Sequence, residues 1–398
     1  MKVHSLSQSL RWQFTILLLL VSLFGLPACQ SKAGFPIGAT GAFSQSPEPK
    51  HGVFKIGFLD ALTGPAAVYG TELQRTAELA TDEINANGGI QGKTLEIIYE
   101  DGKCDGSASA TAGKKLIEVD TVPVIIGFSC SNQVFPILSI SEANHVVLIT
   151  SYSTHPDITR AGRFIFRNNY NDQQTAELLA EMVGSESSKV AILSENQEDT
   201  MAIENHFIKD ISQSFPALRI VSKEHFDFGS SDMRAQITKI LSKNPDVVVI
   251  NPLSPETFGN SLKQLRELGF QGKVFTNWVL SGRISTTFGD LVKDVRFIGE
   301  RSLNTPKKEN LFRIYKQKYH ETPLLDVGST SIYDAIHLIK SAVEKNGESG
   351  QQIADYLHSM ESYEGALGNY RFDDHGDLVG VNLLEEKIII NGTAVPFS

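Results

Sequence analysis

Residues 54–104 read FKIGFLDALTGPAAVYGTELQRTAELATDEINANGGIQGKTLEIIYEDGKC, and they contain the parts of one complete βαβ unit. The apolar run Phe54–Asp60 predicts a buried strand, which a Gly-Pro turn follows. Apolar residues then recur at helical spacing until Gly88 and Gly89, which suit a helix that ends in a left-handed conformation. A second strand, Thr94–Glu100, comes next. This order predicts two parallel strands joined by a crossover helix.

The alternation of strands and helices continues along most of the chain. Further predicted strands are Val122–Phe128, Val146–Ile149, Val190–Leu193, Arg219–Glu224, Asp246–Asn251 and Val274–Thr276. Predicted helices are Val134–Asn144, Gln173–Val183, Met201–Ser214, Met233–Ser242 and Thr257–Leu268. Strands separated by helices form parallel sheets through right-handed crossovers. Because one sheet seldom holds this many units, the sequence predicts an α/β fold with two doubly wound parallel-sheet lobes.

The first 28 residues have the features of a secretory leader. Lys2 and Arg11 precede the apolar run Phe14–Phe24, which is too short to span a bilayer comfortably. Cys29 directly follows Leu26-Pro27-Ala28 and resembles the cysteine of a bacterial lipobox. We therefore expect residues 1–28 to be a lipoprotein signal peptide and Cys29 to be lipidated; a plain signal peptide with a chance cysteine is the alternative. Residues 29–52, rich in Gly, Pro and Ser, predict a flexible tether.

Charge and cysteine content limit the class of protein. The formal net charge is −10, and an acidic chain argues against a nucleic-acid partner and against a polybasic membrane contact. With Cys29 assigned to a lipid, Cys104 and Cys130 remain as an even pair in an exported chain. Each follows a predicted strand, and neighbouring parallel strands would bring the two cysteines together. Both a disulfide and two buried free thiols fit this count.

The turn and the helix end of the first unit resemble those of a known family. Thr63-Gly64-Pro65 with Tyr69-Gly70, and Glu83–Lys93, are similar to the extracytoplasmic solute-binding proteins of the leucine/isoleucine/valine-binding type. These are type I periplasmic binding proteins, which deliver small molecules to ABC importers. The segment Gly368–Asp377 resembles the last strand of the family and its turn, so the resemblance covers nearly the whole exported chain. It also implies a disulfide between the cysteines, because the branched-chain amino-acid binders place one at these two motif positions.

The resemblance supplies the boundaries that composition does not mark. In the type I periplasmic binding protein fold the chain crosses between the lobes three times, in a three-strand hinge. We place the crossings near Asn168, Gly299 and Asn369. Lobe I then comprises residues 53–168 and 300–368, and lobe II comprises residues 169–299 and 369–398.

Two loops predict the first-lobe wall of a ligand cleft. The segments Gly127–Asn132 and Thr150–Pro156 each follow a strand, and clefts in open parallel sheets form at the carboxyl ends of strands. The resemblance implies that the carboxylate and ammonium of a ligand are held by Ser131, Tyr152 through its backbone, Ser153 and Thr154, with Tyr69 closing one side. Taken alone, each of these hydroxyls also fits an ordinary helix cap or turn.

The second lobe departs from the family pattern at three places. Asp199 stands where the family usually has a tyrosine, Leu253 stands where the amino-acid binders place an aromatic residue, and Trp278 stands near the position of their glutamate. Because a buried ammonium needs a counter-charge, Asp199 is our candidate for that role, with Glu195 and Glu198 close by in sequence. A solvated loop is the alternative for these acids. Trp278 either lines the cleft or packs beneath it.

No motif for catalysis, for a cofactor or for a metal is visible, so we expect a protein that is not an enzyme and needs no cofactor. The predicted function is a lipid-anchored extracytoplasmic receptor, monomeric, that binds a small polar solute, foremost an amino acid. It would deliver the solute to the membrane subunits of an ABC importer from the periplasm or cell surface. The alternatives are a ligand-sensing or assembly-regulating lipoprotein on the same fold, or a receptor for urea or a short amide. An exported hydrolase is disfavoured because no nucleophile–base pair is present.

Overall fold

The computed structural model describes residues 52–397, so the predicted leader, Cys29 and nearly all of the tether lie outside the described residues. The strands are β1 (Val53–Asp60), β2 (Thr94–Asp101), β3 (Val124–Gly127), β4 (Val147–Thr150), β5 (Ile165–Arg167), β6 (Lys189–Glu195), β7 (Arg219–Phe226), β8 (Val247–Asn251), β9 (Lys273–Thr276), β10 (Arg296–Glu300), β11 (Tyr363–Gly365), β12 (Gly368–Phe372), β13 (Leu378–Val379), β14 (Leu384–Ile390) and β15 (Thr393–Pro396). The α-helices are α1 (Ala67–Ala86), α2 (Gly106–Lys114), α3 (Leu138–Asn144), α4 (Asp172–Gly184), α5 (Glu198–Ser214), α6 (Arg234–Leu241), α7 (Pro255–Glu267), α8 (Pro306–Tyr319), α9 (Asp326–Asn346) and α10 (Gly350–Ser359). The shorter helical turns are η1 (Lys115–Val119), η2 (Ser131–Gln133), η3 (Phe135–Ile137), η4 (Pro156–Ile158), η5 (Trp278–Leu280), η6 (Ile284–Thr287) and η7 (Gly289–Val292).

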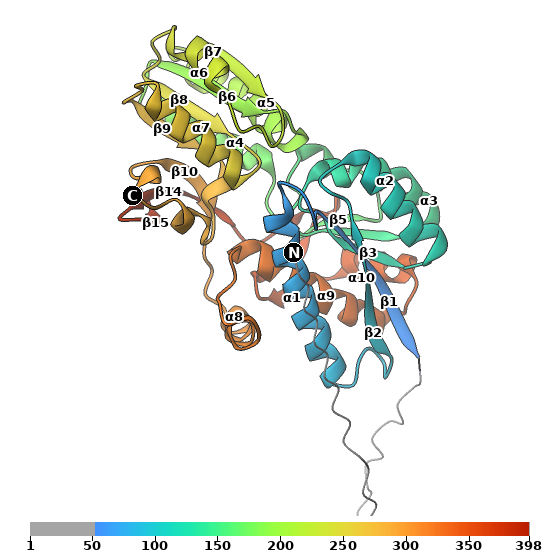
Figure 1. Cartoon of the computed structure of the whole chain (residues 1–398). Coiled ribbons are helices and arrows are strands. Elements are labelled where there is room, and N and C mark those ends of the chain that lie inside the picture. Colours follow the sequence, from blue (N-terminus) through green and yellow to red (C-terminus); the bar gives the residue numbers. More distant parts are fainter. Residues whose placement is uncertain (1–51, 398) are drawn as a thin grey trace, which may run out of the picture. The chain divides into compact units, whose positions relative to one another are not determined.

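Lobe I is built on a five-stranded parallel sheet in the order β2-β1-β3-β4-β5. Successive residues of β1 point to opposite faces: Ile56 and Phe58 pack with α1 and α9, whereas Leu59 packs with α2 and η1. Helices therefore cover both faces of the sheet (Figure 1). A small antiparallel sheet, β11-β12-β13, packs beside it, and the ring centroids of Phe372 in β12 and Phe166 in β5 are 5.2 Å apart.

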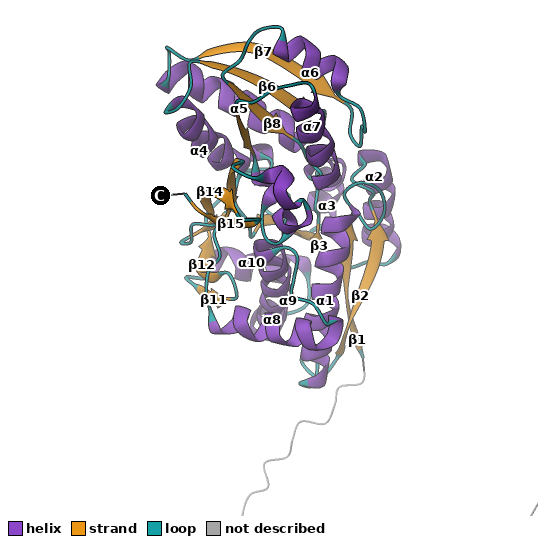
Figure 2. Ribbon diagram, turned by 60° about the vertical axis from the view of Figure 1, so that its left-hand side comes forward, coloured by secondary structure: helices purple, strands orange, loops and turns teal. Residues whose placement is uncertain are grey.

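Lobe II is built on a seven-stranded sheet in the order β15-β14-β10-β9-β8-β6-β7. The five strands from β6 to β10 run parallel, and β14 and β15 add antiparallel edge strands. Ile192 of β6 packs on the face covered by α4 and α5, whereas Leu193 packs on the face covered by α6 and α7 (Figure 2). The predicted fold class, α/β with two doubly wound parallel-sheet lobes, is confirmed.

The chain passes between the two sheets in three segments, which we call the crossings. The first joins β5 to α4 and the second joins β10 to α8, close to the expected positions near Asn168 and Gly299. The third differs from the expectation near Asn369. The strand at Asn369, β12, pairs with β11 and β13, and the chain enters the seven-stranded sheet only at Leu384 of β14.

The segment predicted as one helix, Val134–Asn144, is divided. Two short 3₁₀ turns, η2 and η3, precede a regular helix that begins only at Leu138. Pro136 lies inside η3 and lacks the backbone N–H that a continuous α-helix needs at that position. The loop that carries Ser131 therefore turns twice before the helix starts.

The predicted disulfide between Cys104 and Cys130 is confirmed, with 5.5 Å between the two Cα atoms. The strands that precede the two cysteines are not neighbours, however, because β1 lies between β2 and β3. The two loops reach each other across the end of β1, where Gly102 N donates to Asp60 O at 2.7 Å and Phe128 N donates to Leu59 O at 2.9 Å. The disulfide thus bridges a central strand.

Within residues 52–397, none of the helices combines the length and the apolar character that crossing a membrane requires. The same part of the chain contains no group of three or more His, Cys, Asp or Glu side chains arranged to hold a metal ion.

Candidate functional site

Asp60 at the end of β1 holds the two first-lobe loops in place. Its Oδ1 accepts hydrogen bonds from Ala61 N at 2.7 Å and from Ser129 N at 2.9 Å. The carboxyl is fully buried, and burial raises its pKa to about 6. Asp60 therefore ties the loop after β1 to the loop after β3 at the carboxyl edge of the sheet, where a cleft is expected.

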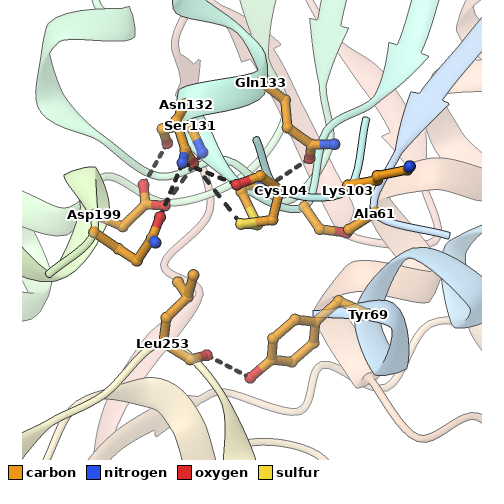
Figure 3. Close-up of a disulfide and its surroundings, with 12 residues drawn as sticks. Ala61, Tyr69, Lys103, Cys104, Ser131, Asn132, Gln133, Asp199 and Leu253 are labelled. Atoms are coloured by element: carbon orange, nitrogen blue, oxygen red, sulfur yellow. Dashed lines mark hydrogen bonds between the residues drawn. A yellow bond between two sulfur atoms is a disulfide. The ribbon is translucent and has the colours of Figure 1, made fainter. Parts of the chain in front are cut away.

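Ser131, predicted to hold a ligand carboxylate, contacts an acidic side chain of the other lobe. Its backbone N donates to Asp199 Oδ2 at 3.2 Å, and its hydroxyl donates to Asp199 Oδ1 (Figure 3). The hydroxyl oxygen also accepts a hydrogen bond from His155 N at 3.1 Å. Both predicted residues, Ser131 and Asp199, are buried, and the structure brings them together directly.

The Thr150–Pro156 loop presents three of the predicted residues, each with its own partner. Tyr152 OH donates to Glu300 Oε1 at 2.8 Å, and Ser153 Oγ donates to Phe128 O at 2.7 Å. Thr154 Oγ1 donates to Asp172 Oδ2 at 2.6 Å. Ser153 thus stabilises the neighbouring loop, whereas Tyr152 and Thr154 donate to the carboxyls of Glu300 and Asp172, which lie at the crossings.

An aromatic group lines the same region. The rings of Tyr69, Tyr152 and Trp278 lie with centroids 5.7 to 6.3 Å apart, and all three side chains are at most 4% exposed. Tyr69 comes from α1 of lobe I and Trp278 from η5 of lobe II. Tyr69 OH donates to the carbonyl of Leu253 at 2.9 Å, which adds another hydrogen bond between the lobes (Figure 3).

Of the three second-lobe acids considered from the sequence, only Asp199 faces lobe I in this way. Glu195 accepts hydrogen bonds from Gly229 N, Leu253 N and Thr257 Oγ1 at 2.7 to 2.9 Å, so it organises the second-lobe loops. Glu198 is exposed on the first turn of α5.

Two buried carboxyls that sequence reasoning missed lie at the crossings. Asp172 begins α4 after the first crossing, and Trp278 Nε1 donates to its Oδ1 at 3.0 Å. Glu300 ends β10 at the second crossing, and Val327 N donates to its Oε2 at 3.1 Å. The only sequence signal for them is that each acid lies in a segment that joins the lobes, whereas most acidic residues lie on the solvated surface.

Buried carboxyls gather where the two lobes meet, and burial controls their protonation. Burial and the nearby charge of Asp199 raise the pKa of Asp172 to about 7. Burial raises the pKa of Glu300 to about 7 and also raises the pKa values of Asp199 and Glu195. None of these four carboxyls forms an ion pair with a Lys, Arg or His side chain of residues 52–397.

The disulfide connects to the inter-lobe contacts through Asn132. The Asn132 side-chain nitrogen donates to Cys104 O at 3.0 Å and to Gln197 Oε1 at 2.9 Å. The second contact joins lobe I to the turn before α5, next to Asp199 (Figure 3). The cystine therefore fixes the wall against which the Asp199 segment rests.

The sequence and the fold of the chain are similar to those of known proteins. A family model described as "Periplasmic binding protein" matches residues 53–380. The leucine-, isoleucine-, valine-, threonine- and alanine-binding protein of Pseudomonas aeruginosa is 26% identical over 330 residues, which cover 81% of this chain and 87% of the relative. A branched-chain amino acid transporter substrate-binding protein of Streptococcus pneumoniae, solved with isoleucine, superposes with a TM-score of 0.76 at 25% identity, covering 86% of this chain and 97% of that one. A solute-binding protein of Rhodopseudomonas palustris solved with benzoate shares the fold, with a TM-score of 0.77 at 16% identity over 87% of this chain and 95% of that one.

Proposed function

Since the chain belongs to the periplasmic binding protein family, we propose that it is an extracytoplasmic receptor for an ABC importer. It binds a small polar solute that carries an amino group, in the cleft between its lobes, and delivers that solute to the membrane subunits.

The observation that carries this proposal is the meeting of side chains from both lobes at one buried place. Ser131 contacts Asp199, and Tyr69 contacts Leu253, while three crossings connect the two sheets. Hydrogen bonds of this kind break and form when two lobes open and close about a hinge. The arrangement supports a cleft that encloses its solute.

The amino group follows from the carboxyls at the crossings. Asp172 and Glu300 are buried and form no ion pair with a side chain of the described residues, and Trp278 Nε1 donates to Asp172. A positively charged group would compensate both acids and would lie well against the aromatic rings. Amino acids are the first class to test, because the Pseudomonas aeruginosa relative is named for binding them and the Streptococcus pneumoniae protein was solved with isoleucine. Asp199 remains our candidate contact for the ammonium.

The anchoring proposal rests on the leader sequence. Lipidation of Cys29 would hold the protein at the membrane after export, with residues up to about 52 as a tether. A monomer tethered in this way remains able to reach its importer.

Tryptophan fluorescence gives a direct binding test. Trp278 is the only tryptophan after the leader, since the other is Trp12, and it lies in the proposed site. Titration with the natural solute should change the emission of Trp278 with one-to-one stoichiometry, and Trp278→Phe should abolish the signal. The solute is identified by gentle purification, denaturation and mass spectrometry of what is released.

Uptake separates a receptor from a sensor. Deletion of the chain should abolish high-affinity uptake of the identified solute, and restoring the wild-type chain should recover it. Unchanged uptake in the deletion strain would exclude the importer role and favour the sensing or assembly-regulating alternative.

A further inference from the structure

The hydroxyls of Ser131, Ser153 and Thr154, which are the first-lobe donors predicted to hold a ligand, already donate to acceptors of the protein. Both donors of Ser131, its N–H and its hydroxyl, point at the Asp199 carboxylate. The hydroxyl of Thr154 donates to Asp172, and the hydroxyl of Ser153 donates to the carbonyl of Phe128. A carboxylate from a lobe II side chain thus occupies the position in which a ligand carboxylate would accept from Ser131.

Two acids of lobe II, Asp199 and Asp172, lie at that position. Asp199 lies in the first turn of α5, and Asp172 is the first residue of α4. The two carboxyls interact electrostatically. The positive charge of Arg167 acts on Asp172. Arg167 is held by Asp377 at 2.6 Å, and its guanidinium donates to the carbonyl of His155 at 2.8 Å.

Each carboxylate still has acceptor capacity for a ligand. An ionised carboxylate offers about four lone-pair positions, whereas Asp199 receives its two hydrogen bonds from Ser131 and Asp172 receives one each from Thr154 and Trp278. A ligand ammonium or amide N–H group can therefore add to the acids without displacing a protein donor. A ligand carboxylate would have to displace Asp199 and would then add a third carboxyl to two buried acids.

We infer that Asp199 determines specificity in this cleft: it fills the carboxylate position at Ser131, so the site selects ligands whose buried end is a cation or an N–H donor and rejects a free carboxylate. The inference rests on the proposed receptor function and narrows its solute class to amines and primary amides.

Ligands that share a carbon skeleton test this directly. The panel is leucine, phenylalanine and alanine, each as the free amino acid, as its primary amide, and as the decarboxylated amine (3-methylbutylamine, 2-phenylethylamine and ethylamine). Calorimetry at pH 7 measures the dissociation constants. On the skeleton that binds best, the amide and the amine should bind at least about tenfold more tightly than the free amino acid, a difference of about 1.4 kcal/mol.

Two matched variants assign the effect to one residue. Asp199→Asn removes the charge with little change in shape, and it should reduce the preference for the amide over the acid by about tenfold. Glu198→Gln removes the same charge from the exposed neighbouring position, and it should leave that preference unchanged. Thermal unfolding without ligand checks that both variants fold; if Asp199→Asn does not, the preference of the wild type decides.

The inference is overturned if the free amino acid binds more tightly than its amide on the best skeleton, or if Asp199→Asn and Glu198→Gln behave alike. It is also overturned if none of the nine compounds binds. These outcomes leave the receptor proposal standing, because that proposal depends on solute-dependent uptake and on the identified solute. Conversely, uptake that does not depend on the chain would exclude the receptor function. The binding measurements would still test the amide preference of the cleft.

Discussion

Removal of the Cys104–Cys130 disulfide should destabilise lobe I by an amount that follows from the loop it closes. The two cysteines are 26 residues apart. On the chain-entropy relation, closing a loop of this length lowers the entropy of the unfolded chain by about 12 cal/mol/K, which is about 3.5 kcal/mol at 25 °C. In the variant Cys104→Ser/Cys130→Ser the unfolded chain regains this entropy, because no bond closes the loop. Both positions are buried in the folded protein, so the serines add no new contact with solvent that would offset the loss.

Urea unfolding followed by circular dichroism measures this effect. For an m value of about 3 kcal/mol/M, the midpoint should fall by about 1.2 M in the double variant. The wild type treated with reductant should fall by a similar amount, and the double variant should not respond to reductant. Hydrogen exchange should locate the loss in the loops after β2 and β3 rather than in lobe II.

A loss below about 1 kcal/mol would refute the loop-closure reasoning, since it lies outside the usual range for a native disulfide of this span. Alkylation of both thiols in freshly exported, non-reduced protein would refute the bond itself. A loss that appears equally in lobe II would show that the bond acts through the inter-lobe contact of Asn132 instead of through the loop.

Three further predictions concern the hinge, the lobe contact and the anchor. Burial raises the pKa of Glu300 to about 7 from 4.5. The folded protein therefore holds a proton at Glu300 that the unfolded chain releases near pH 4.5. The stability that this group contributes is full below about pH 4.5 and is lost as the pH rises through 7. Glu300→Gln should flatten that fall by about 1–3 kcal/mol between pH 5 and 7.5 in thermal or urea unfolding, and an unchanged slope would contradict the burial argument. Tyr69→Phe removes the hydrogen bond to the Leu253 carbonyl and should cost about 0.5–1.5 kcal/mol of stability, whereas Tyr319→Phe, which removes a hydrogen bond at a partly exposed site, is the matched control. Cys29→Ala should shift the protein from the membrane fraction to the soluble or uncleaved fraction, and identical fractionation of wild type and variant would contradict lipidation.

Much of the fold was predictable because its signals are local. The βαβ unit of residues 54–104 and the strands of lobe II appear as short apolar runs separated by helical patterns, and the structure has them as β1, α1, β2 and β6 to β9. The third crossing was not predictable in the same way. β12 resembles a hinge strand in sequence, and only its pairing with β11 and β13 shows that it belongs to lobe I.

The candidate site was predictable on one wall only. Ser131, Tyr152 and Thr154 follow strands in loops with a recognisable pattern, and the structure gathers them. Asp172 and Glu300 carry no motif, because their importance depends on burial at the crossings, which arises from the packing of two lobes that are distant in sequence. The partner of Asp199 was likewise invisible, since no sequence pattern relates α5 to the loop after β3.

The location of Asp172 and Glu300 at two of the three crossings has a mechanical consequence. Groups close to a pivot move little when the arms on either side rotate, whereas Asp199, set on the helix α5 of one arm, travels along an arc. A solute that first contacts the pivot acids would therefore meet a nearly stationary surface, and the swing of α5 would bring Asp199 to it last. The distance of each acid from the hinge would then set the order of contact. Asp172 and Glu300 would bind the solute first, and Asp199 would contact the bound solute last, as the lobes close.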